Sequence, residues 1–461
     1  MSRLICISNR VGPLNDTAQA GGLAVGLVDA LRERGGTWFG WSGNVTETGT
    51  FGPLQMEEQG KVQLATIDIT PADNDEFYAG YTNRTLWPLF HYRLDIADFH
   101  KRFEDAYRRV NNRFAERVKP LIGADDIVWV HDYHFLPLGA ELRRMEVANP
   151  IGFFLHTPFP PPEILTALPR SQAMIRDMMA FDLIGFQTDL DRRCFVRYVV
   201  EELGGSADED GRVHLGETHA TATVFPIGID AESFAKLAVT DVAKTHGDRL
   251  RTLLAGRKQI IGVDRLDYSK GIPERFLAFE RLLQNYPTNR GGVSFMQIAP
   301  LSRAQLDAYT ELRHELESEL GRINGIYADF DWTPIRFLTR GFTRQVLAGL
   351  YRSSAIGLVS PLRDGMNLVA KEYVAAQDPD DPGVLVLSRF AGAAEQMQEA
   401  LIVNPYNTDS MADALQNAID MPLEERKARW TALYTHIREA DAKAWCAHYL
   451  SALDDAAKVR T

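Results

Sequence analysis

The chain has 461 residues, of which 45% are apolar and 24% charged, so it is long enough for two globular domains. The formal charge of −12 argues against sequence-independent binding to nucleic acid, which requires a basic surface. No apolar stretch reaches the roughly 18 residues of a membrane span, and the N-terminal sequence MSRLICISNR lacks the apolar core of a signal peptide. The three cysteines are widely scattered, which excludes a disulfide framework or a metal-binding spacing. We therefore expect a cytoplasmic protein whose partners are neither nucleic acid nor membrane.

Short apolar runs alternate with amphipathic helical patterns along the whole chain. The predicted strands are, in order, 4–8, 37–41, 126–131, 151–156, 182–187, 259–263, 293–299, 335–339, 355–360 and 384–388. Many of them are apolar on both faces, as in strands of a parallel sheet covered by helices on both sides. The predicted helices are 99–118, 190–203, 273–286 and 304–320, followed by a helical tail over 422–458. This alternation predicts an α/β, doubly wound fold. The strand pattern pauses in the polar stretch 231–256, where we expect the chain to pass from one domain to the next.

The stretch AGGLAVGL (20–27) places glycines at the start of a predicted helix. One interpretation is a tight turn with close packing. The other is that backbone N–H groups approach a phosphate or a sugar at the helix N-terminus. No G-x-G-x-x-G follows the first strand and no G-x-x-x-x-G-K-[ST] occurs, so the dinucleotide fingerprint and the P-loop are absent.

Polar side chains follow the predicted strands of the first half, where ligands of α/β domains bind. HDYH (131–134) offers a conceivable metal site, but adjacent strand residues point to opposite faces, and Asp132 is better suited to accept a hydrogen bond from a sugar hydroxyl. HTPFPPPE (156–163) is stiffened by four prolines and would hold His156 at a strand end, in a structural or a functional role. Core packing and stacking on a sugar ring both remain open for three aromatic residues: Trp41, Tyr78 and Trp87.

The stretch GVDRLDYSKGI (262–272) ends a buried strand in two cations and two carboxylates before a helix begins. A surface loop of ion pairs is one interpretation. The other is an anion site, in which Arg265 and Lys270 stabilise the negative charge on a departing diphosphate and Asp267 orients the arginine. Two further arginines, Arg10 and Arg303, each follow a strand and either grip a second phosphate or lie in solvent.

The stretch SPLRDGMNLVAKEYVAAQ (360–377) joins a buried strand to a helix that begins near Met366. The first-turn N–H groups of a helix have no intrahelical partners, and with the helix dipole they suit a diphosphate. Glu372 lies about two turns into the helix, where its carboxylate can accept hydrogen bonds from ribose hydroxyls. The alternative is that Asp364 caps the helix and Glu372 is solvated.

Together these segments resemble the trehalose-6-phosphate synthase family of retaining glycosyltransferases. The resemblance covers almost the whole chain and is carried by SNR, AGGLAVGL, FGWSG, LWPLFHYR, WVHDYHF, FFLHTPFPP, DLIGFQT, GVDRLDYSKGI, QIAPLSR and LRDGMNLVAKEY. It implies the GT-B architecture, with two Rossmann-like doubly wound domains facing a central cleft. The expected domains are an acceptor-binding domain over 1–235, a nucleotide-sugar-binding domain over 236–440, and a C-terminal helix over 441–461 that crosses back onto the first domain.

The resemblance implies transfer of glucose from UDP-glucose to glucose 6-phosphate with retention, giving α,α-trehalose 6-phosphate and UDP. No cofactor and no metal are expected, because cations of the protein take the place of a metal. A homo-oligomer, either a dimer or a tetramer, is expected because family members often form one. Related retaining glycosyltransferases that use ADP- or GDP-glucose, or glycerol 3-phosphate as acceptor, remain alternatives, as do an enzyme that joins cyclitols and a catalytically silent sugar-nucleotide sensor.

The resemblance also assigns roles to individual residues. The implied catalytic residues are Arg265, Lys270 and Asp364. The implied donor-binding residues are these three with Gly22, His156, Gly365, Met366, Asn367, Leu368 and Glu372. The implied acceptor-binding residues are Arg10, Trp41, Tyr78, Trp87, Asp132 and Arg303.

Overall fold

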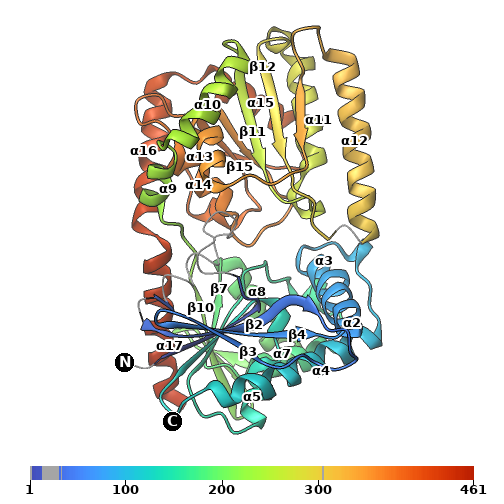
Figure 1. Ribbon diagram of the computed structural model, residues 1–461, viewed down its shortest axis with the longest axis vertical. Coiled ribbons are helices and arrows are strands. Elements are labelled where there is room, and N and C mark those ends of the chain that lie inside the picture. Colours follow the sequence, from blue (N-terminus) through green and yellow to red (C-terminus); the bar gives the residue numbers. More distant parts are fainter. Residues whose placement is uncertain (1–2, 13–30, 33, 304–305, 461) are drawn as a thin grey trace. The chain divides into compact units, whose positions relative to one another are not determined.

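The computed structural model describes residues 3–12, 31, 32, 34–303 and 306–460. The chain divides into two compact units, one made of Met1–Ile227 with Lys443–Thr461 and the other of Gly228–Ala442. Helices and strands alternate along most of both units (Figure 1). None of the helices in the described residues is long and apolar enough to span a membrane.

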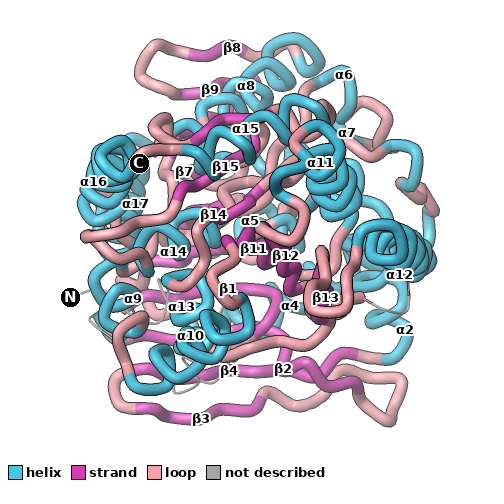
Figure 2. Tube along the Cα trace, turned by 90° about the horizontal axis from the view of Figure 1, so that it is seen from above, coloured by secondary structure: helices cyan, strands magenta, loops and turns pink. Residues whose placement is uncertain are grey.

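The first unit is built on a ten-stranded sheet in the order β3-β4-β2-β1-β5-β6-β7-β10-β9-β8. The seven strands β4, β2, β1, β5, β6, β7 and β10 run parallel to one another. At the edges of the sheet, β3 pairs antiparallel with β4, β9 with β10, and β8 with β9. Figure 2 shows the short β8 and β9 beside α8. The strands are β1 (Leu4–Arg10), β2 (Gly36–Val45), β3 (Gln55–Gln59), β4 (Val62–Ile69), β5 (Ile127–His131), β6 (Ile151–Phe154), β7 (Leu183–Phe186), β8 (Ser206–Ala207), β9 (Arg212–Leu215) and β10 (Thr218–Val224).

The helices of the first unit follow its parallel strands along the chain. A π-helix, η1, extends over Asn74–Leu86 and carries the predicted site residue Tyr78. The remaining helices are α2 (Pro71–Asp73), α3 (Trp87–Phe90), η2 (Leu94–Ile96), α4 (Lys101–Val118), η3 (Lys119–Leu121), η4 (Tyr133–Phe135), α5 (Leu138–Arg144), α6 (Pro162–Leu165), α7 (Ser171–Met178), α8 (Asp189–Leu203) and α17 (Ala442–Arg460).

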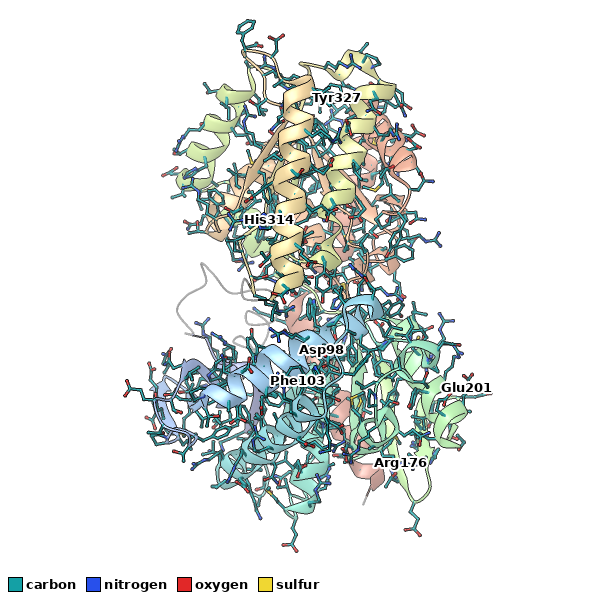
Figure 3. The ribbon with its side chains drawn as sticks, turned by 90° about the vertical axis from the view of Figure 1, so that its right-hand side faces the viewer. Asp98, Phe103, Arg176, Glu201, His314 and Tyr327 are labelled. Atoms are coloured by element: carbon teal, nitrogen blue, oxygen red, sulfur yellow. The ribbon has the colours of Figure 1, made fainter. Side chains whose placement is uncertain are left out.

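The second unit has a six-stranded, fully parallel sheet in the order β13-β12-β11-β14-β15-β16. Its strands are β11 (Lys258–Val263), β12 (Val293–Ile298), β13 (Ile335–Leu338), β14 (Ile356–Val359), β15 (Val384–Ser388) and β16 (Leu401–Val403). Its helices are α9 (Ala231–Leu237), α10 (Asp241–Leu254), η5 (Tyr268–Lys270), α11 (Ile272–Asn285), η6 (Pro287–Asn289), α12 (Asp307–Tyr327), α13 (Arg344–Arg352), α14 (Leu368–Ala376), η7 (Gly392–Glu395), α15 (Thr408–Asp420) and α16 (Leu423–Glu439). The longest of them, α12, carries His314 and Tyr327 (Figure 3).

The central strands confirm the prediction that both faces of each sheet are covered. Every residue of β5, β6 and β7 is buried, and so is every residue of β12, β14 and β15. A parallel strand with helices on both sides has no solvent-facing side, so its apolar residues do not alternate with polar ones. Several strands, by contrast, were absent from the prediction: β3, β4, β8, β9, β10 and β16. Of these, β3 is exposed or half-buried throughout, and its sequence QMEEQ carries no apolar run.

The domain boundaries lie a few residues from those expected at 235/236 and 440/441. The second unit begins at Gly228, because α9 packs within it, with the Phe234 ring 6.3 Å from that of Tyr351. The helical tail is two helices rather than one, since the backbone leaves the helical region at Ala440.

The last helix, α17, packs against the sheet of the first unit (Figure 1). Its Tyr449 Oη donates a hydrogen bond of 2.9 Å to the carbonyl of Phe153, and Trp445 Nε1 donates one of 3.2 Å to the carbonyl of Phe225. Gly152 and Gly185 face this helix, and a Cβ on either would lie within 2.7 Å of the Tyr449 ring or hydroxyl. Glycine at these two strand positions therefore makes the close approach of the helix possible.

Candidate active site

Three residues predicted to bind the acceptor form one cluster in the first unit. The guanidinium of Arg10, at the end of β1, lies 4.2 Å from the centre of the Trp41 ring and 5.9 Å from that of Tyr78. The two rings meet edge to face at 5.1 Å. A Cβ on Gly43 would lie 2.5 Å from Arg10 Nη1, so the glycine of the WSGN turn leaves room for the guanidinium. Arg10 is exposed although Trp41 is buried, so the cluster offers a cation on an aromatic support.

Trp87 belongs to the wall behind this cluster. It begins α3, is buried, and places its ring 4.1 Å from His91 and 5.7 Å from Tyr133. Tyr133 in turn packs at 4.1 Å on His134, whose ring is stacked on Tyr78 at 6.4 Å. The rings thus form a continuous layer that fixes the inner side of Tyr78.

Asp132 and His156 lie next to each other at the ends of β5 and β6. Asp132 Oδ1 accepts a hydrogen bond of 3.2 Å from the backbone N–H of His156, and His131 Nδ1 lies 3.2 Å from His156 Nε2. Burial lowers the pKa of His156 to about 3. The pKa of His131 is also lowered, mainly by burial and to a smaller extent by the neighbouring charge of His156. His156 is therefore a neutral imidazole, suited to hydrogen bonding rather than to holding charge. Asp132 has a φ of 74° and a ψ of 167°, a strained conformation that is rare outside glycine and clusters at functional sites.

In the second unit, Lys270 and Asp364 form an ion pair after β11 and β14. Lys270 Nζ lies 2.5 Å from Asp364 Oδ2, which also accepts a hydrogen bond of 3.0 Å from Asn367 Nδ2. The two loops are joined through the backbone, since Leu362 N–H donates to the carbonyl of Ser269 at 2.8 Å. Arg265 is the exposed residue within 261–270, so its side chain is accessible to a ligand. The structure therefore brings Lys270 and Asp364 together and leaves Arg265, from the same loop as Lys270, at the surface.

Asp267 was expected to orient Arg265, and in the structure its carboxylate contacts Tyr309 of α12 and Arg303 in the loop after β12. Its Oδ2 accepts a hydrogen bond of 3.0 Å from the Tyr309 hydroxyl and lies 3.5 Å from Arg303 Nη1. Arg303 Nη1 also donates to the Tyr309 hydroxyl at 2.7 Å. Arg303 has a left-handed backbone with φ of 51°. This buried carboxylate and tyrosine hold the guanidinium of Arg303 in place.

The segment Gly365–Leu368 leads into α14 without a side-chain cap. Asn367 precedes the helix with φ of 74°, and Leu368 is its first residue. Two buried polar atoms here, Asn367 Oδ1 and Ser269 Oγ, have no hydrogen-bond partner within the described part of the chain. Buried polar groups are nearly always paired, so these atoms and the uncapped N–H groups are suited to a polar ligand.

Glu372 lies inside α14, half-buried and 4.0 Å from Arg344 Nη2. Burial raises the pKa of Glu372 to about 7, against the opposing charge of Arg344. Arg344 itself stacks over the Phe234 ring at 5.1 Å. The glutamate is thus held in a setting where its charge changes near neutral pH. Gly22, the remaining predicted donor residue, lies outside the described residues.

The comparisons with known proteins assign this arrangement to a family. The model described as Glycosyltransferase family 20 matches residues 10–455. The chain belongs to glycosyltransferase family 20. The trehalose-6-phosphate synthase of Sodalis glossinidius (strain morsitans) is 45% identical over 465 residues, covering 100% of this chain and 97% of that protein. The family expected from the sequence motifs is therefore confirmed.

Two solved structures of this kind are similar over nearly their whole length. One is an alpha,alpha-trehalose-phosphate synthase (UDP-forming) from Burkholderia xenovorans in complex with glucose-6-phosphate, with a TM-score of 0.95, 48% identity, and coverage of 98% of this chain and 100% of that chain. The other is from E. coli, bound with UDP-2-fluoro glucose, with a TM-score of 0.94, 45% identity, and coverage of 98% and 99%. The predicted GT-B fold class is confirmed by these likenesses and by the two parallel-sheet units.

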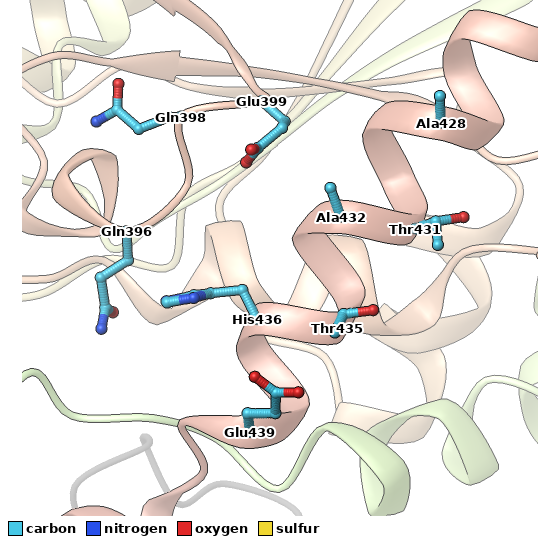
Figure 4. A pocket seen from close by; sticks show the side chains of 9 residues that line it. All are labelled: Gln396, Gln398, Glu399, Ala428, Thr431, Ala432, Thr435, His436 and Glu439. Atoms are coloured by element: carbon cyan, nitrogen blue, oxygen red, sulfur yellow. The ribbon is translucent and has the colours of Figure 1, made fainter.

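A groove of about 620 Å³ lies elsewhere in the second unit of this family 20 chain (Figure 4). Figure 4 shows α16 side chains such as His436 and Glu439 on one side and Gln396 on the other. None of the predicted site residues lines it. It is joined to α14 through Lys371, whose Nζ donates to Gln396 Oε1 at 2.8 Å and whose pKa burial lowers to about 7.

Several residues around the predicted site escaped the sequence analysis. Tyr309 and Arg344 contact Asp267 and Glu372, respectively, and each comes from a segment without a predicted motif. A third, Arg275, occupies the apolar stripe of α11 between Ile272 and Phe279. A cation on an apolar stripe is a usable sequence signal, because an arginine there must find buried partners.

Proposed function

We propose that this chain transfers glucose from UDP-glucose to glucose 6-phosphate with retention, forming α,α-trehalose 6-phosphate and UDP. The observation that carries the proposal is its likeness, at 45–48% identity over nearly the whole chain, to synthases solved with glucose-6-phosphate and with UDP-2-fluoro glucose. The side chains described above supply the chemistry that these two substrates need.

Donor binding is assigned to the second unit, with a contribution from His156. The uncapped N-terminus of α14 and the cations Lys270 and Arg265 bind the diphosphate, which shares Lys270 with its ion-pair partner Asp364. Glu372 accepts hydrogen bonds from the ribose hydroxyls. His156, neutral because of its lowered pKa, hydrogen-bonds the donor glucose without attracting its diphosphate.

Acceptor binding is assigned to Arg10 and Arg303 for the phosphate, and to Trp41, Tyr78, Trp87 and Asp132 for the sugar. Arg10 lies on an aromatic support and Arg303 is held by Asp267 and Tyr309, so both guanidinium groups are oriented before the ligand arrives. An oriented guanidinium binds two phosphate oxygens at once and loses little entropy in doing so. Asp132 accepts a hydrogen bond from a sugar hydroxyl.

The transfer step breaks the bond between C1 of the donor glucose and the phosphate oxygen, and the electron pair leaves with the diphosphate. The anomeric hydroxyl of glucose 6-phosphate attacks C1 on the same face, and its proton passes to the departing phosphate oxygen. Arg265 and Lys270 stabilise the charge that develops there. No covalent glycosyl-enzyme forms in this scheme, because the acceptor and the leaving group share one face and no enzyme nucleophile is needed.

The test is to measure UDP release from UDP-glucose, with and without glucose 6-phosphate, in the presence of a chelator. Release that depends on glucose 6-phosphate and survives chelation is expected, since protein cations fulfil the role of a metal. Release that depends on glycerol 3-phosphate instead, or that occurs only from ADP- or GDP-glucose, would refute the proposed substrates. Loss of release on chelation, restored by a divalent cation, would refute metal independence alone.

We also propose the cytoplasm as the compartment and a homo-oligomer as the assembly. The cysteines Cys6, Cys194 and Cys446 are all free thiols, which suits a reducing environment. Two large apolar side chains near the end of α12, Ile326 and Phe330, are 60% and 98% exposed, which favours a contact with another chain. Light scattering on the purified protein tests the assembly: a dimer or tetramer is expected, and a monomer at assay concentration contradicts it.

A further inference from the structure

Arg275 is a fully buried arginine in the fourth position of α11. Its guanidinium donates four hydrogen bonds. Three go to side chains in or directly after three different strands, and the fourth goes to a backbone carbonyl. Nε donates to Ser360 Oγ at 2.9 Å, Nη1 to Asp264 Oδ2 at 2.6 Å and to Gln297 Oε1 at 3.1 Å, and Nη2 to the carbonyl of Lys270 at 3.0 Å. Isolated buried charges are costly, so an arginine with this many partners is held in a single position.

The acceptors lie where the loops of the donor half of the site begin. Asp264 follows β11, Gln297 lies in β12, and Ser360 follows β14. Glycines make room for the guanidinium and its partners: a Cβ on Gly262 would lie 3.0 Å from Arg275 Nη1, and Gly271 takes a φ of 66° directly after Lys270. The arginine therefore ties together the ends of three neighbouring strands.

Lys270 is consequently held at both ends. Its carbonyl accepts from Arg275, and its ammonium group pairs with Asp364 Oδ2. The carboxylate of Asp264 is bound by the same guanidinium, and burial raises the pKa of Asp264 while the charges of Arg275 and Lys270 oppose that rise. The Arg275 side chain thus holds both ends of the loop 264–270, which also carries Arg265.

We propose that Arg275 is a positioning residue for the transfer reaction, which sets the place of Lys270 and Arg265 against the donor diphosphate without touching a substrate. The inference rests on the proposed function. A displacement of about 1 Å in a positioned group costs on the order of 100-fold in rate. Lysine cannot replace this arginine, because a single ammonium group cannot reach all four acceptors that the three guanidinium nitrogens bind.

The test uses the full chain in two variants, Arg275→Lys and the double variant Asp264→Asn/Arg275→Met. The second removes charge from both partners, so that no unpaired buried carboxylate unfolds the protein. Rates are expressed per folded molecule, with the folded fraction taken from a thermal melt by circular dichroism. We expect kcat to fall about 100-fold in both variants. The KM for glucose 6-phosphate is expected to rise by a smaller factor than kcat falls, because this loop acts on the acceptor site indirectly, through the contact of Asp267 with Arg303.

The control is Arg322→Lys, which alters a two-bonded ion pair between α12 and Glu280 of the same α11. This variant is expected to keep the kcat of the unmodified chain. Equal loss of kcat in the control, or near-normal kcat in either folded Arg275 variant, overturns the proposal. So does a loss expressed only as a higher KM for glucose 6-phosphate.

Calorimetric binding of UDP separates failure of this inference from failure of the proposed function. If the unmodified chain makes no trehalose 6-phosphate, the proposed function fails. The Kd for UDP is then compared between the unmodified chain and Arg275→Lys. A rise of about tenfold or more in Arg275→Lys supports the positioning role, because charged hydrogen bonds to the diphosphate are each worth about that factor. An unchanged Kd for UDP then overturns it.

Discussion

Lys270 and Asp364 are 94 residues apart in the chain, yet Lys270 Nζ lies 2.5 Å from Asp364 Oδ2. Each residue follows a strand of the same parallel sheet, and β11 and β14 are direct neighbours in it. The pair neutralises a cation at the position where the donor diphosphate is proposed to bind. Binding of the donor must therefore compete with, or share, this contact.

Replacing Lys270 by methionine should lower kcat by roughly 100- to 1000-fold, the loss seen when a single group that stabilises transition-state charge is removed. The methionine side chain is unbranched and only one atom shorter, so packing changes little. Steady-state rates of UDP release measure the effect. A variant that retains more than about a tenth of the normal kcat would show that Lys270 is not needed for charge stabilisation.

Replacing Asp364 by asparagine separates donor binding from transfer. The amide keeps the shape but no longer neutralises Lys270, so UDP should bind at least as tightly as before. The kcat should still fall by about 100-fold, because the anchor that orients the ammonium group is lost. Calorimetry with UDP and steady-state kinetics give the two quantities, and weaker UDP binding would contradict the competition between Asp364 and the diphosphate.

The affinity for UDP-glucose should depend on pH through Glu372, whose pKa burial raises to about 7. The ionised carboxylate accepts hydrogen bonds from ribose, and it becomes protonated as the pH falls through the pKa. The KM for UDP-glucose is therefore expected to rise as the pH is lowered from about 8 to about 6, while kcat changes little. Glu372→Gln should give a KM that no longer depends on pH over this range, and an unaltered pH dependence in that variant would assign it to another group.

Replacing Gly43 by alanine should displace Arg10, since the new Cβ would lie 2.5 Å from its Nη1 and Gly43 has a φ of 97°. We expect the KM for glucose 6-phosphate to rise by about 10- to 100-fold, the value of one charge-assisted hydrogen bond, with the Kd for UDP unchanged. Gly49→Ala is the matched control, because a Cβ there meets no atom within 4 Å. Comparable effects of the two substitutions would mean that the arginine was not the cause.

Replacing Tyr449 by phenylalanine should weaken the docking of α17 on the first unit. The hydroxyl donates to the carbonyl of Phe153 at 2.9 Å, and its loss should lower the free energy of unfolding by about 1 kcal/mol. The ring and its packing on Trp129, at 4.5 Å between ring centres, remain. Denaturant titration followed by fluorescence measures the change, and an equal stability of both proteins would show that the hydrogen bond contributes nothing net.

Much of this protein follows from its sequence alone, because the governing forces act locally. The alternation of apolar runs and helical patterns predicted ten of the parallel-sheet strands, from β1 (Leu4–Arg10) to β15 (Val384–Ser388), together with helices such as α4 and α8. In a parallel sheet the carboxyl ends of the strands meet on one edge, so the residues after each strand could be selected as site candidates. The motifs at these positions are sufficient to identify the family.

Local patterns failed where no apolar period exists. The edge strands β3, β8 and β16 are short or exposed, so they carry no two-sided apolar run. The π-helix over Asn74–Leu86 has no distinctive repeat in NDEFYAGYTNRTL, and its geometry depends on packing of Phe77 and Tyr81 against Tyr107 of α4.

Only the tertiary structure decided which side chains contact each other across the fold. Asp267 was expected to orient Arg265, and in the structure its carboxylate contacts Arg303 and Tyr309. The contacts of Lys270 with Asp364, of His131 with His156 and of Arg275 with Gln297 and Ser360 all join separate segments of the chain. Such pairs depend on strand order and register, which arise from the packing of the whole sheet and leave no periodic signal in the sequence around either partner.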